Sequence, residues 1–346
     1  MLRGGSRWAS RFKIFLPRLK NDYKTPPFLL TFSSSFTTTA PTAGTGAADN
    51  DSSQPGRPSA PPPIQVGFTD SAGRGVFATR RIAAGELIHT AKPIVCHPSL
   101  SSLHSVCYFC LRKLLPDQRP LFQSNDVQFC SQECQNQSQV FHKIERRADW
   151  STFNDYCRMH GLKYPLLVKR FACLVISGSS SASNLDILQP ASLSSEMISL
   201  VEKEFCLLRS TFQDADINTQ QLAFLTKQWY TGVLARIRIN AFRVELACES
   251  YEDLLSSAAA SVEAEGAVGN AIYMLPSFYN HDCDPNAHIL WPENVDARVK
   301  ALCDIEAGEE LRICYIDASM DYEARQTILS KGFGFQCNCL RCSSHH

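Results

Sequence analysis

Cysteine is the residue type whose number and spacing most clearly suggest chemistry in this sequence. The chain has 346 residues and 15 cysteines, and seven of the cysteines fall into three tight groups: Cys107 and Cys110; Cys130 and Cys134; and Cys337, Cys339 and Cys342. Groups spaced in this way favour zinc ligation in a reducing compartment over the disulfide framework of a secreted protein. The odd total also argues against complete disulfide pairing.

The first two groups together supply four thiolates, in the patterns Cys107-x-x-Cys110 and Cys130-x-x-x-Cys134. A tetrahedral set of four cysteines is a closed, structural zinc geometry. The segment 111–129 is long enough to bring the two pairs together. We therefore predict one structural zinc site here, the alternative being that these cysteines are buried free thiols.

The third group supplies only three thiolates, from Cys337, Cys339 and Cys342. A structural zinc ion needs a fourth ligand. The spacing of the cysteines alone does not say where that ligand lies, and a disulfide within the group is the alternative.

The elements that must position these cysteines follow from the periodicity of apolar residues. Residues 64–95 and 270–316 consist of short apolar runs between glycine turns, which is typical of strands, whereas 139–174 and 194–246 have helical spacing. We therefore predict an α+β fold in which a cysteine-rich and helical insertion interrupts a β-rich domain. The expected segments are 1–60, a disordered tail; 61–100, the first β part; 101–145, a zinc module; 146–246, a helical insertion; 247–332, the second β part; and 333–346, a zinc-binding tail.

Charge and hydropathy give no strong sign of direct nucleic-acid binding and argue against a membrane span. Lys plus Arg and Asp plus Glu both total 34, so the net charge is zero. A neutral chain lacks the broad basic surface that non-specific nucleic-acid binding needs. No run of apolar residues approaches the roughly 20 that a membrane-spanning helix requires.

The first 60 residues have the composition of a targeting segment. Residues 1–24 contain seven basic side chains and one acid, Asp22, with apolar residues at helical spacing, and 31–60 are rich in Ser, Thr, Pro and Ala. This pattern predicts a transit peptide for the mitochondrion or a plastid. The arginine content favours the mitochondrion. The alternative is a disordered basic tail on a nuclear or cytoplasmic protein.

Four separated motifs together resemble the SET-domain lysine methyltransferases. They are Gly73-Arg74-Gly75, Asn280-His281-Asp282-Cys283-Asp284-Pro285-Asn286, the run from Gly308 to Tyr315, and the terminal run from Phe335 to Cys342. Their order and separations match that family over residues 64–342. The insertion resembles the SMYD branch, in which a MYND zinc module splits the SET domain, and the chain is also similar to the plant trithorax-related SET proteins.

The resemblance implies a β-rich SET core of small sheets with a threaded, pseudo-knotted C-terminus and a Cys-rich post-SET tail. It also implies that Cys283 is the fourth ligand of the terminal zinc site. The MYND resemblance is incomplete, since no Cys-x-x-Cys lies within 111–129 and Arg146 stands where the family has a cysteine. We therefore expect one zinc ion in this module, with His142 left outside the ligand set.

The resemblance also implies a binding site for S-adenosylmethionine. Tyr315 is the expected catalytic residue, Phe333 the expected wall of the lysine channel, and Phe335 the aromatic that stacks on adenine. The other expected cofactor residues are Gly73, Arg74, Gly75, Asn240, Asn280 and His281, together with Tyr315 itself. The alternatives are core packing for the two phenylalanines, a helix cap or turn for Asn240, and a β-turn for the glycines.

The reaction that this site implies is methyl transfer to a lysine of a protein. Lysine has a solution pKa of about 10.4, so it must lose its proton before it attacks, and a narrow apolar channel favours the neutral amine. The predicted function is an S-adenosylmethionine-dependent protein-lysine N-methyltransferase acting on a histone tail or an organelle protein. The alternative is a catalytically silent SET-fold scaffold for protein partners. The other cysteines, such as Cys173, Cys206, Cys303 and Cys314, are expected in the core.

Overall fold

The computed structural model describes residues 61–69, 71–114, 122–124, 127–247 and 267–344. The predicted transit peptide lies outside these residues. The fold described below is that of the unit Ala60–His346 alone.

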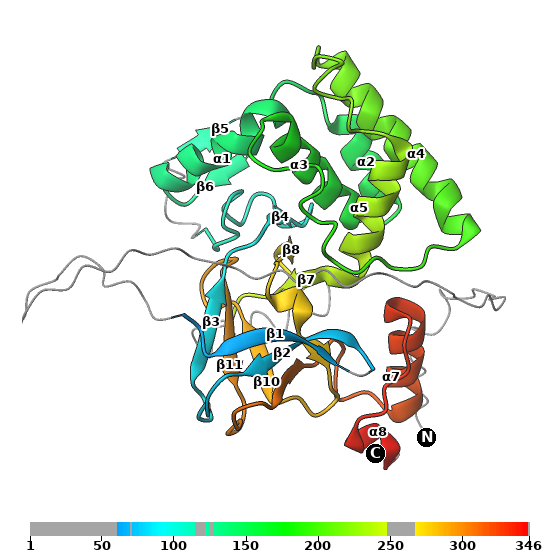
Figure 1. The fold of residues 1–346 in the computed structure, drawn as a ribbon. Helices are drawn as coiled ribbons and strands as arrows, with labels where there is room; N and C mark the ends of the chain where they lie inside the picture. Colours follow the sequence, from blue (N-terminus) through cyan, green and yellow to red (C-terminus); the bar gives the residue numbers. More distant parts are fainter. Residues whose placement is uncertain (1–60, 70, 115–121, 125–126, 248–266, 345–346) are drawn as a thin grey trace, which may run out of the picture. The chain divides into compact units, whose positions relative to one another are not determined.

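In the described part of this unit, the strands form three small sheets and one short hairpin (Figure 1). The first sheet has the order β1-β2-β12-β9, formed by Ile64–Thr69, Gly73–Ala78, Glu310–Ile313 and Asn280–His281. The second has the order β10-β11-β3, formed by Ala287–Leu290, Ala297–Ala301 and Leu87–Ala91. The third has the order β4-β8-β7, formed by Val95–Pro98, Gly269–Ile272 and Ala241–Val244, and β5 and β6 are Phe122–Ser124 and Val127–Phe129.

Among the described residues, five helices lie between strands β4 and β7 in the sequence: α1 Gln132–Glu145, α2 Ser151–Met159, α3 Tyr164–Ile176, α4 Ser195–Asp214 and α5 Lys227–Asn240. The hydroxyls of Ser194 and Thr226 cap α4 and α5 by accepting from backbone N–H groups of the first turn. Because β4 and β7 both pair with β8, the chain leaves the third sheet before the insertion and returns to it afterwards. The predicted α+β fold with an inserted helical block is thus confirmed.

Helix α3 is the centre of the helical block. Leu167, Val168 and Phe171 are fully buried in a core that also receives side chains from α1, α2, α4 and α5. Figure 1 shows these helices on one side of the third sheet and the other two sheets on its opposite side. The C-terminal elements are α7 Tyr322–Ile328, a single π-helical turn Leu329–Phe333 and α8 Leu340–Ser343. No helix in the described part of the chain has the length and apolarity needed to cross a bilayer.

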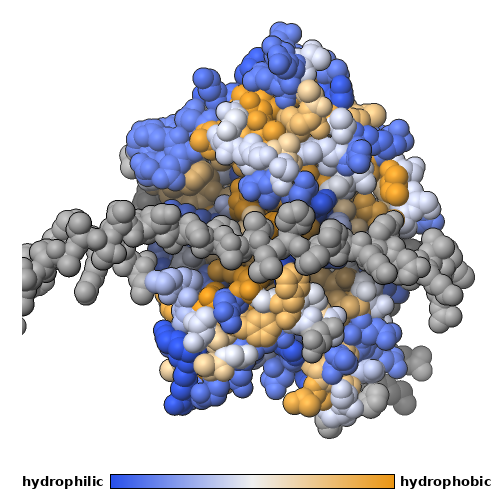
Figure 2. Space-filling view, in the orientation of Figure 1, coloured by the Kyte–Doolittle hydropathy of each residue, from blue (hydrophilic) through white to orange (hydrophobic). Residues whose placement is uncertain are grey.

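The β1–β2 hairpin extends from the core toward residues 71–74. Ile64, Val66 and Phe68 share one face of β1, because alternate residues of a strand point the same way. Ile64 packs against the core, whereas Val66 and Phe68 are 45% and 82% exposed. Figure 2 shows apolar atoms gathered over the position of this hairpin.

A buried ionic cluster joins α1 to α3. Glu145, at the end of α1, accepts hydrogen bonds from the Tyr108 hydroxyl at 2.9 Å and from Nε of Arg170 at 3.3 Å. Nζ of Lys169 lies 4.0 Å from the same carboxylate, and all of these side chains are buried. Burial alone would raise the pKa of Glu145, but the charges of Arg170 and Lys169 hold that pKa well below its usual range. The charges are therefore paired inside the protein.

The expectation that the scattered cysteines lie in the core is only half right. Cys173 is buried and Cys314 is half-buried, but Cys206 and Cys303 are exposed. The prediction was wrong for these two because an apolar neighbour in sequence does not fix which face of a helix or turn a side chain occupies.

Candidate active site and zinc centres

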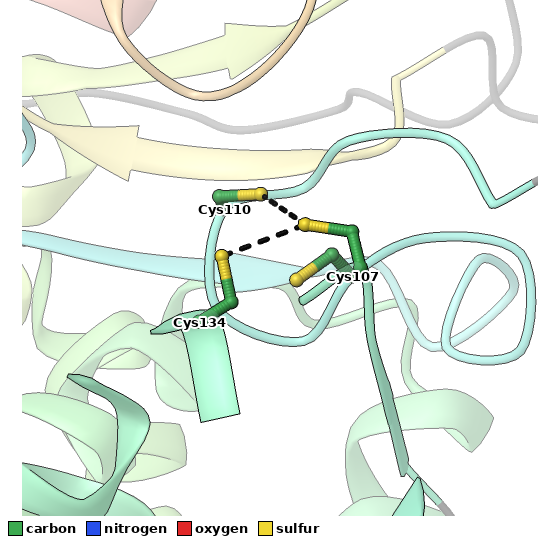
Figure 3. A group of neighbouring side chains, drawn as sticks. Cys107, Cys110 and Cys134 are labelled. Atoms are coloured by element: carbon green, nitrogen blue, oxygen red, sulfur yellow. Dashed lines mark hydrogen bonds between the residues drawn. The ribbon is translucent and has the colours of Figure 1, made fainter. Parts of the chain in front are cut away.

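The four cysteines of the first predicted zinc site lie together. All four Sγ atoms of Cys107, Cys110, Cys130 and Cys134 are within 4.8 Å of one another. Figure 3 shows three of these residues, Cys107, Cys110 and Cys134, with their sulfur atoms turned toward one another. Sγ of Cys130 is 3.5 Å from that of Cys110 and 3.5 Å from that of Cys134. A zinc ion with Zn–S bonds of about 2.3 Å separates its sulfur ligands by roughly 3.8 Å, so the cluster fits tetrahedral zinc.

Local structure holds these four cysteines in place. Cys107 and Cys110 lie in a tight turn, closed by the bond from the Leu111 N–H to the Cys107 carbonyl at 2.9 Å. Cys134 lies in the first turn of α1, and its N–H donates to the capping hydroxyl of Ser131 at 3.1 Å. The turn and the helix cap bring the two pairs of thiols together.

The second group also forms a cluster, and it includes Cys283 as the resemblance implied. The Sγ atoms of Cys283, Cys337, Cys339 and Cys342 lie within 4.8 Å of one another. Sγ of Cys283 is 3.5 Å from that of Cys342 and 3.9 Å from that of Cys337. The fully buried Arg325 brings Nη2 to 3.9 Å from Sγ of Cys342, which places a positive charge beside a set of potential thiolates. This group also fits zinc.

His142 stands apart from both clusters of cysteines. It is 4% exposed, its ring packs against Tyr108 and Phe129, and its Nδ1 lies 3.6 Å from Oε2 of Glu145. These neighbours give His142 a place in the core of the zinc module.

A cleft of about 1470 Å³ gathers the remaining predicted residues. Its lining includes Gly73, Arg74, Asn240, Asn280, His281, Tyr315, Phe333 and Phe335, whereas Gly75 does not line it. These residues come from the β1–β2 hairpin, the end of α5, strand β9, the end of β12 and the C-terminal segment. Residues far apart in the sequence therefore meet in one cleft.

Tyr315 lies two residues after β12, at the inner side of an aromatic cluster. Its hydroxyl donates to the backbone carbonyl of Tyr279 at 2.5 Å, and its N–H donates to Nδ1 of His281 at 3.0 Å. Its ring centroid is 5.1 Å from that of Phe333 and 6.4 Å from that of Phe335. Burial raises the pKa of Tyr315, so its hydroxyl stays protonated at neutral pH.

Asn280 has its side-chain nitrogen committed to the protein. Nδ2 donates to the Arg74 carbonyl at 3.0 Å and to Oε1 of Glu310 at 2.7 Å. Because an amide nitrogen has two hydrogens, Oδ1 is the group left to accept from a ligand in the cleft. Oε2 of Glu310 in turn accepts from Nη2 and Nε of Arg312 at 2.6 and 2.8 Å.

His281 connects the cleft to the second cysteine cluster. Burial lowers the pKa of His281 to about 4, opposed by the charge of Asp282, so the imidazole is neutral at pH 7. Since Nδ1 accepts from the Tyr315 N–H, Nε2 carries the remaining proton and points it at Sγ of Cys283, 3.3 Å away. The imidazole of His281 therefore contacts both the backbone of Tyr315 and the thiol of Cys283.

The Gly73-Arg74-Gly75 motif has a structural explanation for both glycines. Gly73 has φ of +75° where the β1–β2 hairpin turns, a conformation that favours glycine. A Cβ on Gly75 would lie 2.7 Å from Oε1 of Glu310. Between them, Arg74 lines the cleft and places its guanidinium 4.6 Å from the ring of Phe278. Gly73 and Arg74 thus line the cleft, and Arg74 is the member of this motif whose side chain could reach a ligand there.

Asn240 ends α5 and links it to the loop that precedes α4. Its Nδ2 donates to the carbonyls of Arg236 and Gln189 at 2.7 and 2.8 Å. These bonds match the alternative of a residue at a helix end, and contact with a cofactor stays a prediction. The sequence analysis missed Tyr279, whose carbonyl holds the Tyr315 hydroxyl, although its position directly before Asn280 was a usable signal.

Comparison with known proteins places this geometry in a family. The SET domain family model matches residues 173–316. The histone-lysine N-methyltransferase ATXR4 of Arabidopsis thaliana is 66% identical over 285 residues, covering 82% of this chain and 87% of the relative. A SET and MYND domain-containing protein of Dictyostelium discoideum is 27% identical over 271 residues, covering 74% and 76%.

Solved structures give a weaker likeness. The SET domain of LSMT bound to lysine and AdoHcy shares 13% identity, covers 81% of this chain and 54% of that chain, and has a TM-score of 0.34. The identity to ATXR4 is what defines the class. The chain belongs to the SET-domain lysine methyltransferases, in a branch related to the SET and MYND proteins.

Proposed function

We propose that this chain transfers a methyl group from S-adenosylmethionine to the ε-amine of a lysine in a histone. The observation that carries the proposal is the Tyr315 hydroxyl, fixed on the Tyr279 carbonyl beside Phe333 and within the same cleft as Asn280. The name of ATXR4 supports a histone as the substrate.

The residues of the cleft fit such a cofactor. When bound, S-adenosylmethionine supplies an electrophilic methyl carbon on a sulfonium. Oδ1 of Asn280 offers an acceptor for the ammonium of its amino-acid part, because both Nδ2 hydrogens are already used. Phe335, 36% exposed, offers a ring for the adenine to stack on. The volume of the cleft accommodates a nucleoside and a lysine side chain together.

The aromatic residues then prepare the lysine. Apolar walls formed by Tyr315, Phe333 and Phe335 disfavour the charged ammonium, so the amine enters the reaction neutral after its proton has passed to solvent. The fixed hydroxyl of Tyr315 orients the amine and its lone pair, and alignment of this kind supplies much of the rate. The same walls keep water away from the reacting atoms.

Both cysteine clusters are proposed to hold zinc. The separations of 3.5–3.9 Å between sulfur atoms support tetrahedral coordination. In the second site, Cys283 follows β9 and the other ligands lie in the last turns of the chain. A metal ion there would join the C-terminal segment, including Phe335, to the strand that carries Asn280, so that metal binding completes the cleft.

The proposed targeting segment gives a second class of substrate. Residues 1–60 have the composition of a mitochondrial or plastid transit peptide, which supports an organelle protein as substrate. Fusion of residues 1–60 to a fluorescent protein tests the address. Accumulation of the fusion in mitochondria or plastids supports the proposal, whereas a nuclear and cytoplasmic signal contradicts it.

Transfer of a labelled methyl group separates the two classes of substrate. The full chain is incubated with labelled S-adenosylmethionine and either core histones or a mitochondrial extract. Label on histones supports the histone proposal, and label on organelle proteins alone moves the substrate to the second class. Folded, zinc-loaded protein that labels neither pool contradicts the enzyme and favours the scaffold alternative.

A further inference from the structure

The backbone carbonyl and the side-chain hydroxyl of Tyr279 each make one hydrogen bond that bears on the active site. Its backbone carbonyl accepts from the Tyr315 hydroxyl at 2.5 Å. Its own hydroxyl lies 2.9 Å from Nε2 of His89, a residue of strand β3. Tyr279 is 1% exposed and packs in the core of the β part. A single buried side chain thus connects Tyr315 to a strand of another sheet.

His89 itself does not line the cleft. It pairs in register with the fully buried Val299 of β11, so its backbone lies on the edge strand β3, next to the central strand of the second sheet. Burial lowers the pKa of His89 to about 4, and the imidazole makes a further hydrogen bond to the backbone of Thr90. The ring is therefore neutral, with Nε2 available to accept from the Tyr279 hydroxyl.

The hydrogen bond between the Tyr279 hydroxyl and His89 helps to hold the backbone of Tyr279 in place. Tyr279 leaves the short 3-10 turn Pro276–Phe278 in an extended conformation, with φ of −72° and ψ of 126°. Its N–H bond back to the carbonyl of Pro276 is long, at 3.4 Å. The turn therefore holds Tyr279 weakly, which leaves the pairing of β9 with β12 on one side and the buried side chain of Tyr279 to fix the carbonyl.

We propose that His89 is a positioning residue for methyl transfer, acting through Tyr279 to fix the carbonyl that holds the Tyr315 hydroxyl. The inference rests on the proposed function. It differs from the function of the cleft residues, because His89 reaches the reacting atoms only through Tyr279. Displacement of a catalytic group by about 1 Å can cost on the order of a hundredfold in rate. Loss of one anchor is expected to cost about tenfold.

The test uses the full chain and four variants: Tyr279→Phe, His89→Leu, His89→Gln and the double variant Tyr279→Phe/His89→Leu. Tyr279→Phe removes one hydroxyl and keeps the ring in the core, so it remains informative if His89→Leu fails to fold. His89→Gln retains a side-chain acceptor. For each variant, kcat and KM on histone, the Kd for S-adenosylhomocysteine and the melting temperature are measured.

Tyr279→Phe and His89→Leu are each expected to lower kcat about tenfold, with KM and the Kd for S-adenosylhomocysteine changed less than twofold. The double variant is expected to lose no more than the worse single variant, because both remove the same hydrogen bond. His89→Gln should recover part of the loss. The melting temperatures of the four variants are expected not to follow the order of their kcat values.

Unchanged kcat in Tyr279→Phe would overturn the inference while leaving the proposed function intact. Losses that multiply in the double variant would also overturn it, since the two residues would then act independently. Equal losses in kcat and in binding of S-adenosylhomocysteine would point to a general structural role instead. Lack of turnover by the wild-type chain on every lysine substrate would overturn the proposed function and this inference together.

Discussion

Replacement of Glu310 tests how the cleft holds its cofactor. Oε1 of Glu310 accepts a hydrogen bond from Asn280 Nδ2 that helps to orient the Asn280 amide, and its Oε2 accepts from Arg312 at the same time. In Glu310→Ala one hydrogen of Asn280 Nδ2 loses its partner. The bond to the Arg74 carbonyl alone then orients the amide, so Oδ1 is presented less firmly to the ammonium of the cofactor. We therefore expect weaker cofactor binding.

The size of the effect follows from the partners of Glu310. A hydrogen bond to a charged group contributes about 1.5–3 kcal/mol. The side chain of Glu310 is 11% exposed but that of Arg312 is 44% exposed. Solvent therefore reduces the free-energy contribution of the ion pair between Glu310 and Arg312. The hydrogen bond between Asn280 and Glu310 contributes about 1.5 kcal/mol, which corresponds to roughly a tenfold change in the Kd of the cofactor.

Isothermal titration with S-adenosylhomocysteine measures this change directly. Glu310→Gln is the matched control, because its amide oxygen still accepts from Asn280, and we expect a change of about threefold or less. The melting temperature and the zinc content of each variant show whether the fold is kept. A folded Glu310→Ala variant with the wild-type Kd would refute the reasoning about the Asn280 amide.

Three further predictions concern metal content, stability and pH. The wild-type chain is expected to hold two zinc ions, and Cys134→Ser and Cys342→Ser one each, as measured by elemental analysis; full zinc content in either variant would exclude that cluster as a site. Glu145→Gln removes the buried negative charge between Arg170 and Lys169 and is expected to lower the free energy of unfolding by about 3–5 kcal/mol in denaturant titrations. A loss below about 1 kcal/mol would contradict this. The pKa of His89 is about 4 when folded and about 6.5 when unfolded, so the unfolded chain binds more protons between these values. Stability is therefore expected to fall as pH drops from about 6.5 to 4, and His89→Gln should show a shallower fall than wild type, whereas equal slopes would count against a neutral, buried His89.

Short-range spacing predicted the parts of the site whose geometry is local. Cys107 and Cys110 lie in one turn, and Cys134 lies in the first helical turn after Cys130, so their spacing alone identified a shared ligand set. Cys283 is different. It lies more than 50 residues before Cys337, and only the family resemblance connected it to the terminal cysteines.

Contacts between distant segments explain what the sequence analysis missed. His89 and Tyr279 are 190 positions apart, and each has the appearance of an ordinary strand or turn residue. Glu145 and Arg170 are 25 positions apart, and charges on helices are more often exposed than paired in a core. Gly73 lines the cleft, Gly75 does not, and contact of either glycine with a cofactor stays a prediction. The spacing of the glycines did not show that a Cβ at position 75 would collide with the side chain of Glu310.

Tyr315→Phe gives the most direct test of the account. The substitution removes the hydroxyl that bonds to the Tyr279 carbonyl and leaves the aromatic ring against Phe333. The full-length wild-type chain is predicted to transfer labelled methyl groups from S-adenosylmethionine to histone. Tyr315→Phe is predicted to lose at least about 100-fold in kcat, the size expected when a group that orients the reactants is removed. It should bind S-adenosylhomocysteine with a Kd within about threefold of the wild type. Wild-type turnover that survives undiminished in Tyr315→Phe would contradict the central role of this hydroxyl.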